Sequence, residues 1–205
     1  GHVDFSYEVT KSLSACEGAI LLVDAAQGVE AQTVANLQQS IEKKLKIIPV
    51  INKIDLQNAE PDRIKQEITG ILKLEEDNII LASAKDGTGT EEILERIVKD
   101  VPAPKGEKTQ PLQALIFDSK YDIYRGVIIY VRVFNGAITK GMHIIMMSSK
   151  KRYEVQEVGV FKPTMQPVDS LSCGEVGYLT CQIKDAKDVI NGDTITGLNH
   201  PAEKP

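Results

Sequence analysis

The sequence is poor in several features that mark specialised classes of protein. It has no tryptophan, 5% aromatic residues and three cysteines in 205 residues. The cysteines form no C-x-x-C pair, which argues against a zinc site or a disulfide framework. No apolar run approaches the roughly 18 residues that a membrane-spanning helix needs, and the first twenty residues mix charged with apolar side chains, unlike a signal peptide. We therefore expect a soluble protein of a reducing, intracellular compartment.

Strong basic character is also missing. Residues 1–110 carry 13 basic and 19 acidic side chains, and residues 111–205 carry 11 and 10. Neither half has the basic excess of a free-standing nucleic-acid-binding protein, so any contact with RNA must be local. The basic run at 150–152 and the tyrosines Tyr121, Tyr124 and Tyr130 are candidates for such a contact. A solvated turn is the simpler explanation for the basic run, and barrel packing or rim positions are the simpler explanation for the tyrosines.

The first half of the chain alternates strands and helices. Apolar runs at 19–23, 47–51 and 79–81 predict three strands, the first of them buried on both faces. Helical spacing predicts helices over 30–44, 62–73 and 90–99. The apolar side chains expected to face inward are Val34, Leu37, Ile41, Ile64, Ile68, Ile71, Leu72, Ile93, Leu94, Ile97 and Val98. This repeated order favours a parallel sheet with right-handed crossovers over residues 1–100.

The second half has a different period. Residues 101–111 contain three prolines among polar residues and predict a linker between domains. Beyond it, short β-branched and aromatic runs alternate with turn signals such as Asn135-Gly136. Residues 112–199 are therefore expected to form a small antiparallel β-barrel. The three cysteines, Cys16, Cys173 and Cys181, are expected to be buried apolar residues.

One short motif carries specific chemistry. Asn52-Lys53-Ile54-Asp55 follows the second predicted strand, where parallel sheets place their ligand loops. The Asp55 carboxylate can accept hydrogen bonds from the ring N–H and the exocyclic amine of guanine, a pair of donors that adenine lacks. Four residues alone are a weak signal, and a surface turn after a strand is the simpler interpretation of them. Ser83-Ala84-Lys85 follows the third strand, however, where its backbone could reach the guanine carbonyl, and the two segments together predict a guanine site.

Longer segments make the chain similar to a known family. Residues 1–33 resemble the switch II region and the following strand of translational GTPases, and residues 83–90 narrow the match. Together with segments 115–122, 126–127, 173–178 and 192–194, they resemble the elongation factor 4 (LepA) family over the whole chain. The resemblance implies an α/β parallel sheet that is part of a P-loop GTPase domain, followed by a small antiparallel β-barrel.

The resemblance also implies roles for individual residues. Asn52, Lys53 and Asp55 would bind guanine, Ile54 would support their loop, and Ser83, Ala84 and Lys85 would complete the pocket. His2 would be the catalytic residue that positions the attacking water. Gly1-His2 could instead be the remnant of an expression tag, although the family pattern continues without a break into residues 3–8.

The phosphate half of such a site is missing from the sequence. No G-x-x-x-x-G-K-[ST] loop occurs among the 205 residues, and the switch I threonine region is absent too. Family members bind GTP or GDP with Mg²⁺, and the residues that hold the phosphates and the ion belong to those segments. We therefore expect no metal site in this chain and no GTP hydrolysis by the chain alone. We also expect the strand at 19–23 to form an open apolar edge.

The resemblance implies partners for the parent protein. Members of the family hydrolyse GTP on the ribosome and promote back-translocation of tRNAs, with the barrel on small-subunit rRNA and proteins. They are cytoplasmic, and peripheral association with the inner face of the cell membrane also occurs in the family. Two alternatives stay open: a non-catalytic ribosome-docking module, and a fragment of another translational GTPase such as BipA or the sulfate-activating branch.

Overall fold

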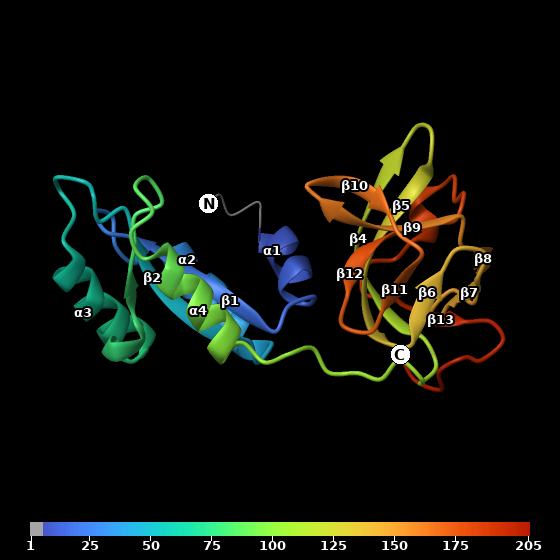
Figure 1. Cartoon of the computed structure of the whole chain (residues 1–205), viewed down its shortest axis with the longest axis horizontal. Coiled ribbons are helices and arrows are strands. Elements are labelled where there is room, and N and C mark those ends of the chain that lie inside the picture. Colours follow the sequence, from blue (N-terminus) through green and yellow to red (C-terminus); the bar gives the residue numbers. More distant parts are fainter. Residues whose placement is uncertain (1–5) are drawn as a thin grey trace. The chain divides into compact units, whose positions relative to one another are not determined.

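The computed structural model describes residues 6–205, which form two compact units (Figure 1). The first unit ends at Ala103 and the second begins at Pro104. The first contains α1 (Ser6–Leu13), β1 (Gly18–Asp24), α2 (Ala31–Glu42), β2 (Lys46–Asn52), α3 (Pro61–Leu72), the 3-10 turn η2 (Glu76–Asn78), β3 (Ile80–Leu81) and α4 (Thr90–Asp100). The three predicted strands and three predicted helices are therefore present, and α1 is an addition.

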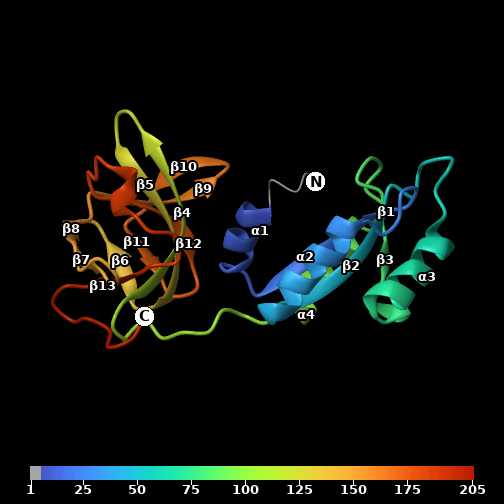
Figure 2. The same ribbon diagram turned by 180° about the vertical axis from the view of Figure 1, so that it is seen from behind.

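The three strands form one parallel sheet in the order β1-β2-β3, with helices on both faces. Side chains of β2 alternate between the faces. Ile51 packs with buried residues of α2 and α3, whereas Ile48 and Val50 pack against the apolar side of α4. Figure 2 shows the first unit from behind, with α2 in front of the sheet. The predicted parallel α/β architecture is confirmed.

Each helix buries a narrower face than its apolar residues suggest. Leu37, Ile64 and Ile68 are buried as expected. Five others predicted to face inward are exposed, because a helix on one face of a three-stranded sheet presents only a narrow stripe to it. These are Val34 (39%), Ile41 (56%), Ile71 (57%), Leu94 (57%) and Val98 (83%).

The first strand lies at the edge of the sheet and is not buried on both faces. Leu21 and Val23 are buried, but Ile20 and Leu22 are 45% and 59% exposed, so the prediction of a strand covered on both sides was wrong. In the parallel register Ile20 lies beside Ile48, on the face that α4 covers over β2 and β3. Among the described strands β1 pairs with β2 alone, which confirms the expected open apolar edge.

Two isoleucines of α3 provide a test of this packing. Ile68 is fully buried, whereas Ile71 is 57% exposed one turn along the same helix. Ile68→Ala is expected to lower the free energy of unfolding of the first unit by about 2–4 kcal/mol, because it leaves a cavity in the core. Ile71→Ala should change it by less than about 0.5 kcal/mol. Denaturant titration followed by the helical circular-dichroism signal measures both, and equal losses would contradict the packing.

The second unit consists of antiparallel strands. They are β4 (Gln113–Asp122), β5 (Gly126–Asn135), β6 (Ala137–Thr139), β7 (His143–Met146), β8 (Arg152–Glu154), β9 (Glu157–Lys162), β10 (Thr164–Pro167), β11 (Ser170–Ser172), β12 (Val176–Thr180) and β13 (Thr194–Gly197), with the 3-10 turn η3 (Ala186–Asp188) before β13. Eight strands form one sheet in the order β10-β9-β12-β5-β4-β13-β7-β8, and β11 pairs with β6. The predicted antiparallel barrel is confirmed.

The barrel has its own apolar core. Inward residues of β5 such as Val127, Ile129 and Val131 are fully buried and share that core with Ile116 and Leu179 of the neighbouring strands. A separate chain of aromatic contacts joins Phe117, Tyr130, Phe161 and the fully buried Tyr178. In the described part of the molecule, no helix is long and apolar enough to cross a membrane.

The structure shows which of the cysteines and tyrosines named in the sequence analysis are buried and which are exposed. Cys181 is buried, and burial raises the pKa of its thiol to about 12. Cys16 is exposed, so its predicted burial was wrong. Tyr130 packs against Phe161, with ring centroids 5.3 Å apart. Tyr124, by contrast, is 90% exposed at the β4–β5 turn.

Candidate functional site

The two predicted guanine segments lie beside each other at the carboxyl ends of neighbouring strands. Asn52 is the last residue of β2, and Ser83 comes two residues after the end of β3. Parallel pairing of these strands brings the loops that follow them to the same edge of the sheet. Backbone bonds continue this pairing past the strands, because the Ile54 amide donates to the Ala82 carbonyl at 3.3 Å.

Side chains of the first loop hold the second. The Asn52 Oδ1 accepts a hydrogen bond from the Ala84 amide at 3.0 Å. The Ser83 hydroxyl donates to the Asp55 Oδ1 at 2.8 Å, and Ser83 is fully buried. The Lys85 ammonium lies 3.6 Å from the Asp55 Oδ2 and is largely exposed. The structure therefore brings together all the residues predicted from these two segments.

The loop after Ser83 is closed by its own hydrogen bonds. The Ser83 amide donates to the Thr88 carbonyl at 2.9 Å, and the Gly87 amide donates back to the Ser83 carbonyl at 2.9 Å. Asp86 accepts from the hydroxyl and the amide of Thr88, and these bonds lower the pKa of its carboxyl. These hydrogen bonds hold the loop in a closed conformation.

Asp24, which was not predicted from the sequence, joins the loop after β2 to the end of β1. Asp24 ends β1, and its Oδ2 lies 2.7 Å from the Lys53 ammonium. The hydrogen bond from Lys53, followed by those from the Ala26 and Gln27 amides, lowers the pKa of the Asp24 carboxyl. The same contact raises the pKa of Lys53. Its place at the carboxyl end of a parallel strand was the signal that could have identified Asp24.

This ion pair predicts a pH dependence. The pKa of Asp24 is lowered in the folded chain, so the ion pair stabilises the fold fully at pH values above the ordinary Asp range. That contribution to folding stability is lost as the pH falls through the lowered pKa. NMR titration of the Asp24 carboxyl carbon should give a midpoint below the usual range. Lys53→Met should return that midpoint toward it. An unchanged midpoint in Lys53→Met would show that Lys53 does not cause the shift.

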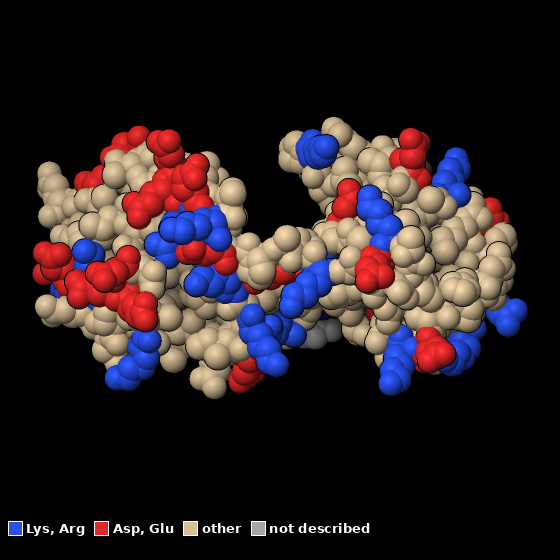
Figure 3. Space-filling model, turned by 60° about the horizontal axis from the view of Figure 1, so that its bottom comes forward, with Lys and Arg blue, Asp and Glu red and all other residues tan. Residues whose placement is uncertain are grey.

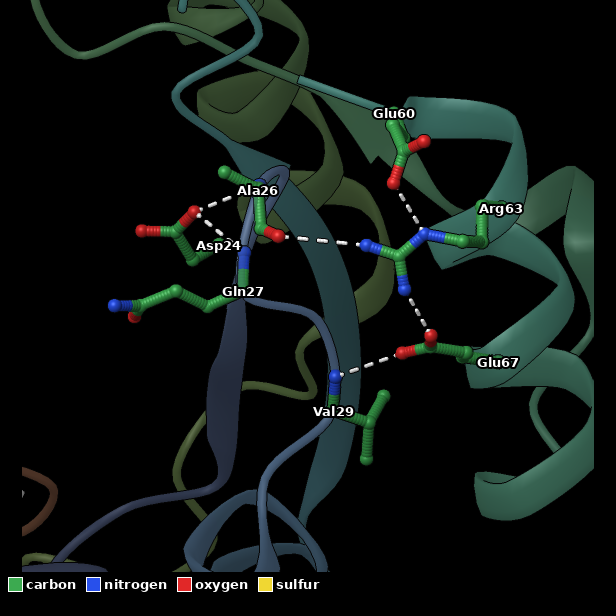
Figure 4. A network of polar contacts seen from close by, with 7 residues as sticks. All are labelled: Asp24, Ala26, Gln27, Val29, Glu60, Arg63 and Glu67. Atoms are coloured by element: carbon green, nitrogen blue, oxygen red, sulfur yellow. Dashed lines mark hydrogen bonds and ion pairs between the residues drawn. The ribbon is translucent and has the colours of Figure 1, made fainter. Parts of the chain in front are cut away.

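The loop that follows Asp24 is held by α3 (Figure 4). The Glu67 Oε2 accepts the Val29 amide at 3.0 Å. Arg63 donates to the Ala26 carbonyl at 3.4 Å and forms ion pairs with Glu60 and Glu67. Side chains of α3 therefore hold the loop between β1 and α2.

Charged side chains of both signs lie on the surface of each unit (Figure 3). On the face drawn in Figure 3, basic and acidic side chains are interspersed over each unit. Across residues 6–205, no three His, Cys, Asp or Glu side chains gather in a way that could hold a metal ion. His2, predicted to be catalytic, lies outside the described residues.

Comparison with known families identifies the class of protein. Residues 1–103 match the model of the elongation factor Tu GTP-binding domain. The chain belongs to this family of translational GTPases. Residues 126–196 match elongation factor Tu domain 2, so the barrel has the type that follows this GTP-binding domain.

Individual relatives show which branch of the family the chain resembles. Proteins named Elongation factor 4 from Thermotoga maritima, Geobacillus thermodenitrificans and Halalkalibacterium halodurans are 60%, 57% and 55% identical to the whole chain. The expected resemblance to the elongation factor 4 family is thus confirmed. The chain spans about a third of the length of these relatives, 33–34%.

A solved structure supports the fold of the chain. Translation elongation factor SelB from Methanococcus maripaludis, solved in complex with the GTP analogue GppNHp, matches with a TM-score of 0.78 and 22% sequence identity. The match covers 97% of this chain and 45% of that one.

Proposed function

We propose that the first unit binds the base of a guanine nucleotide with Asn52, Lys53 and Asp55 from one loop and Ser83, Ala84 and Lys85 from the other. The observation that supports this most directly is the pair of hydrogen bonds, Asn52 to Ala84 and Ser83 to Asp55, that joins the loops into one cradle. Ile54 supports the cradle through the hydrogen bond that its amide donates to the Ala82 carbonyl.

The donor and acceptor groups of the cradle fit guanine. An ionised carboxylate has about four acceptor positions, and in Asp55 the Ser83 hydroxyl occupies one of them. The Lys85 ammonium is exposed and beyond hydrogen-bond distance, so it can move away from the Asp55 Oδ2. The Asp55 Oδ2 and the remaining acceptor position on Oδ1 can then each accept one hydrogen bond, from the exocyclic amine and the ring N–H of guanine. Adenine offers no such pair of donors.

We further propose that the longer protein containing this chain is a GTPase that acts on the ribosome and promotes back-translocation of tRNAs. Support comes from the family to which the chain belongs and from relatives named Elongation factor 4. His2 would orient the attacking water in that protein. Phosphate and Mg²⁺ contacts would come from other segments, because the described residues offer no ion-binding cluster and the sequence no phosphate loop.

Base recognition is tested by NMR titration of the 205-residue chain with GDP, with ADP as control. GDP should shift the amide signals of Ile54, Ala84 and Lys85, and ADP should leave them in place. Equal shifts with both nucleotides, or none with either, would contradict guanine recognition by these loops.

Catalysis by the longer protein is tested by a chimaera. The residues that precede the matching region in the Thermotoga maritima relative are joined to Gly1, and GTP turnover is measured with and without ribosomes. The 205-residue chain alone should give no turnover, whereas the chimaera should hydrolyse GTP when ribosomes are present. His2→Ala in the chimaera should abolish the stimulation. Turnover by the chain alone would refute the assignment of the phosphate contacts to other segments.

A further inference from the structure

The sheet register places Asp24 next to the guanine loop. Asp24 and Asn52 are the last residues of β1 and β2 and lie opposite each other in the parallel pairing. The Ala25 amide continues that pairing by donating to the Asn52 carbonyl at 2.8 Å. The backbone therefore fixes the distance between Asp24 and the loop that begins at Lys53.

The Asp24 carboxylate contacts both the turn that follows β1 and the side chain of Lys53 in the guanine loop. Its Oδ1 accepts hydrogen bonds from the Ala26 amide at 2.8 Å and the Gln27 amide at 3.2 Å (Figure 4). Its Oδ2 lies 2.7 Å from the Lys53 ammonium. The Asp24 side chain is only 16% exposed, so it is held between the two.

Lys53 needs such a contact to adopt one conformation. Its backbone has φ 67°, a left-handed conformation that is unfavourable for a residue with a Cβ. Its side chain is 54% exposed and could adopt many rotamers without a fixed partner. The ion pair with Asp24 fixes the ammonium end, and the left-handed backbone fixes the other end, so the aliphatic stem between them has a defined course.

The loop between β1 and α2, which begins after Asp24, is held in place by contacts with α3. Arg63 and Glu67 of α3 contact the Ala26 carbonyl and the Val29 amide, and the Glu60 amide donates to the Ala25 carbonyl at 2.9 Å. A Cβ on Gly28 would lie 2.4 Å from the Glu67 Oε2, so loop and helix are in close contact there. Asp24 therefore holds Lys53 from a rigid support.

From these contacts we infer that Asp24 is a positioning residue of the guanine site, which acts through Lys53 by holding its aliphatic stem where the face of the base will lie. Asp24 does not itself touch the nucleotide. The inference rests on the proposed guanine recognition. It adds a residue from a third strand, β1, to the two loops that the sequence indicates.

Asp24→Asn removes the ion pair with Lys53 and keeps the hydrogen bonds of the turn. The asparagine oxygen can still accept from the Ala26 and Gln27 amides, but the negative charge opposite Lys53 is lost. The GDP affinity of the 205-residue chain, measured by NMR titration, should fall about fivefold, as expected for loss of a partly exposed ion pair. Asp122→Asn is the matched control, because Asp122 accepts from the Tyr124 and Arg125 amides in the same kind of turn in the barrel. It should leave GDP affinity unchanged.

A double-mutant cycle distinguishes positioning through Lys53 from a general structural effect. If Asp24 acts through Lys53, Asp24→Asn should have no further effect on GDP affinity in a Lys53→Met background. A full fivefold loss in that background, or no loss in the wild-type background, would overturn the inference.

A second measurement needs no nucleotide. In Asp24→Asn, the Cα and Cβ chemical shifts of Lys53 should move away from left-handed values, and its ammonium protons should exchange faster with water. Unchanged Lys53 signals would overturn the inference. If wild-type chain fails to bind GDP, the proposed guanine recognition is refuted, and the role of Asp24 in holding Lys53 is still decided by these signals.

Discussion

Asp55→Asn is expected to reverse the base preference of the chain. The carboxylate accepts two hydrogen bonds from guanine, whereas an amide presents one acceptor and one donor group. Xanthine carries an oxygen in place of the exocyclic amine, so it matches the amide at both positions. The preference for GDP over the xanthine nucleotide should change by about ten- to a hundredfold in favour of xanthine, the usual scale for a bidentate contact to a base.

The structure makes this variant a clean test. The Ser83 hydroxyl that donates to the Asp55 Oδ1 can donate to the asparagine oxygen as well, so the two loops should stay joined. NMR titrations with GDP and xanthosine diphosphate measure the preference. Asp77→Asn, at an exposed position in η2, is the charge control and should keep the wild-type preference. A chain that loses both nucleotides equally would show that Asp55 supports the loop and does not contact the base.

The second large effect is expected at a glycine that closes the Ser83 loop. Gly89 has φ 76°, and a Cβ built there would lie 2.3 Å from the Leu81 carbonyl oxygen in β3. The Leu81 carbonyl belongs to β3 and Gly89 directly precedes α4, so the backbone at neither residue can move aside easily. Gly89→Ala is therefore expected to lower the free energy of unfolding of the first unit by about 3 kcal/mol, from the left-handed backbone and the clash together.

Gly87 provides the matched control in the same loop. It has φ 87°, but a Cβ there would meet no atom within 4 Å. Gly87→Ala should cost only about 1 kcal/mol, the penalty of a left-handed residue. Denaturant titration followed by helical circular dichroism measures both variants. Equal losses would mean that the Leu81 carbonyl moves to accommodate the new methyl group and that the close approach is unimportant.

The edge strand shows where reasoning from a single segment stops. The run at 19–23 is apolar throughout, and such runs are typical of strands covered on both faces. In the structure, α2 and α3 cover Leu21 and Val23, but α4 does not reach over Ile20 and Leu22. The composition of a strand indicates which side chains can be buried. The helices and strands that pack against it decide which of them are buried.

The sequence by itself determined the order of strands and helices, the antiparallel barrel and the loops that carry Asn52, Asp55 and Ser83. These features follow from hydrophobic periodicity and turn residues, which act over a few positions along the chain. Only the tertiary structure decided that Asp24 holds Lys53, residues 29 positions apart, and that Glu67 holds Val29, residues 38 positions apart. Such contacts depend on sheet register and helix placement, because parallel pairing brings together loops that are distant in sequence.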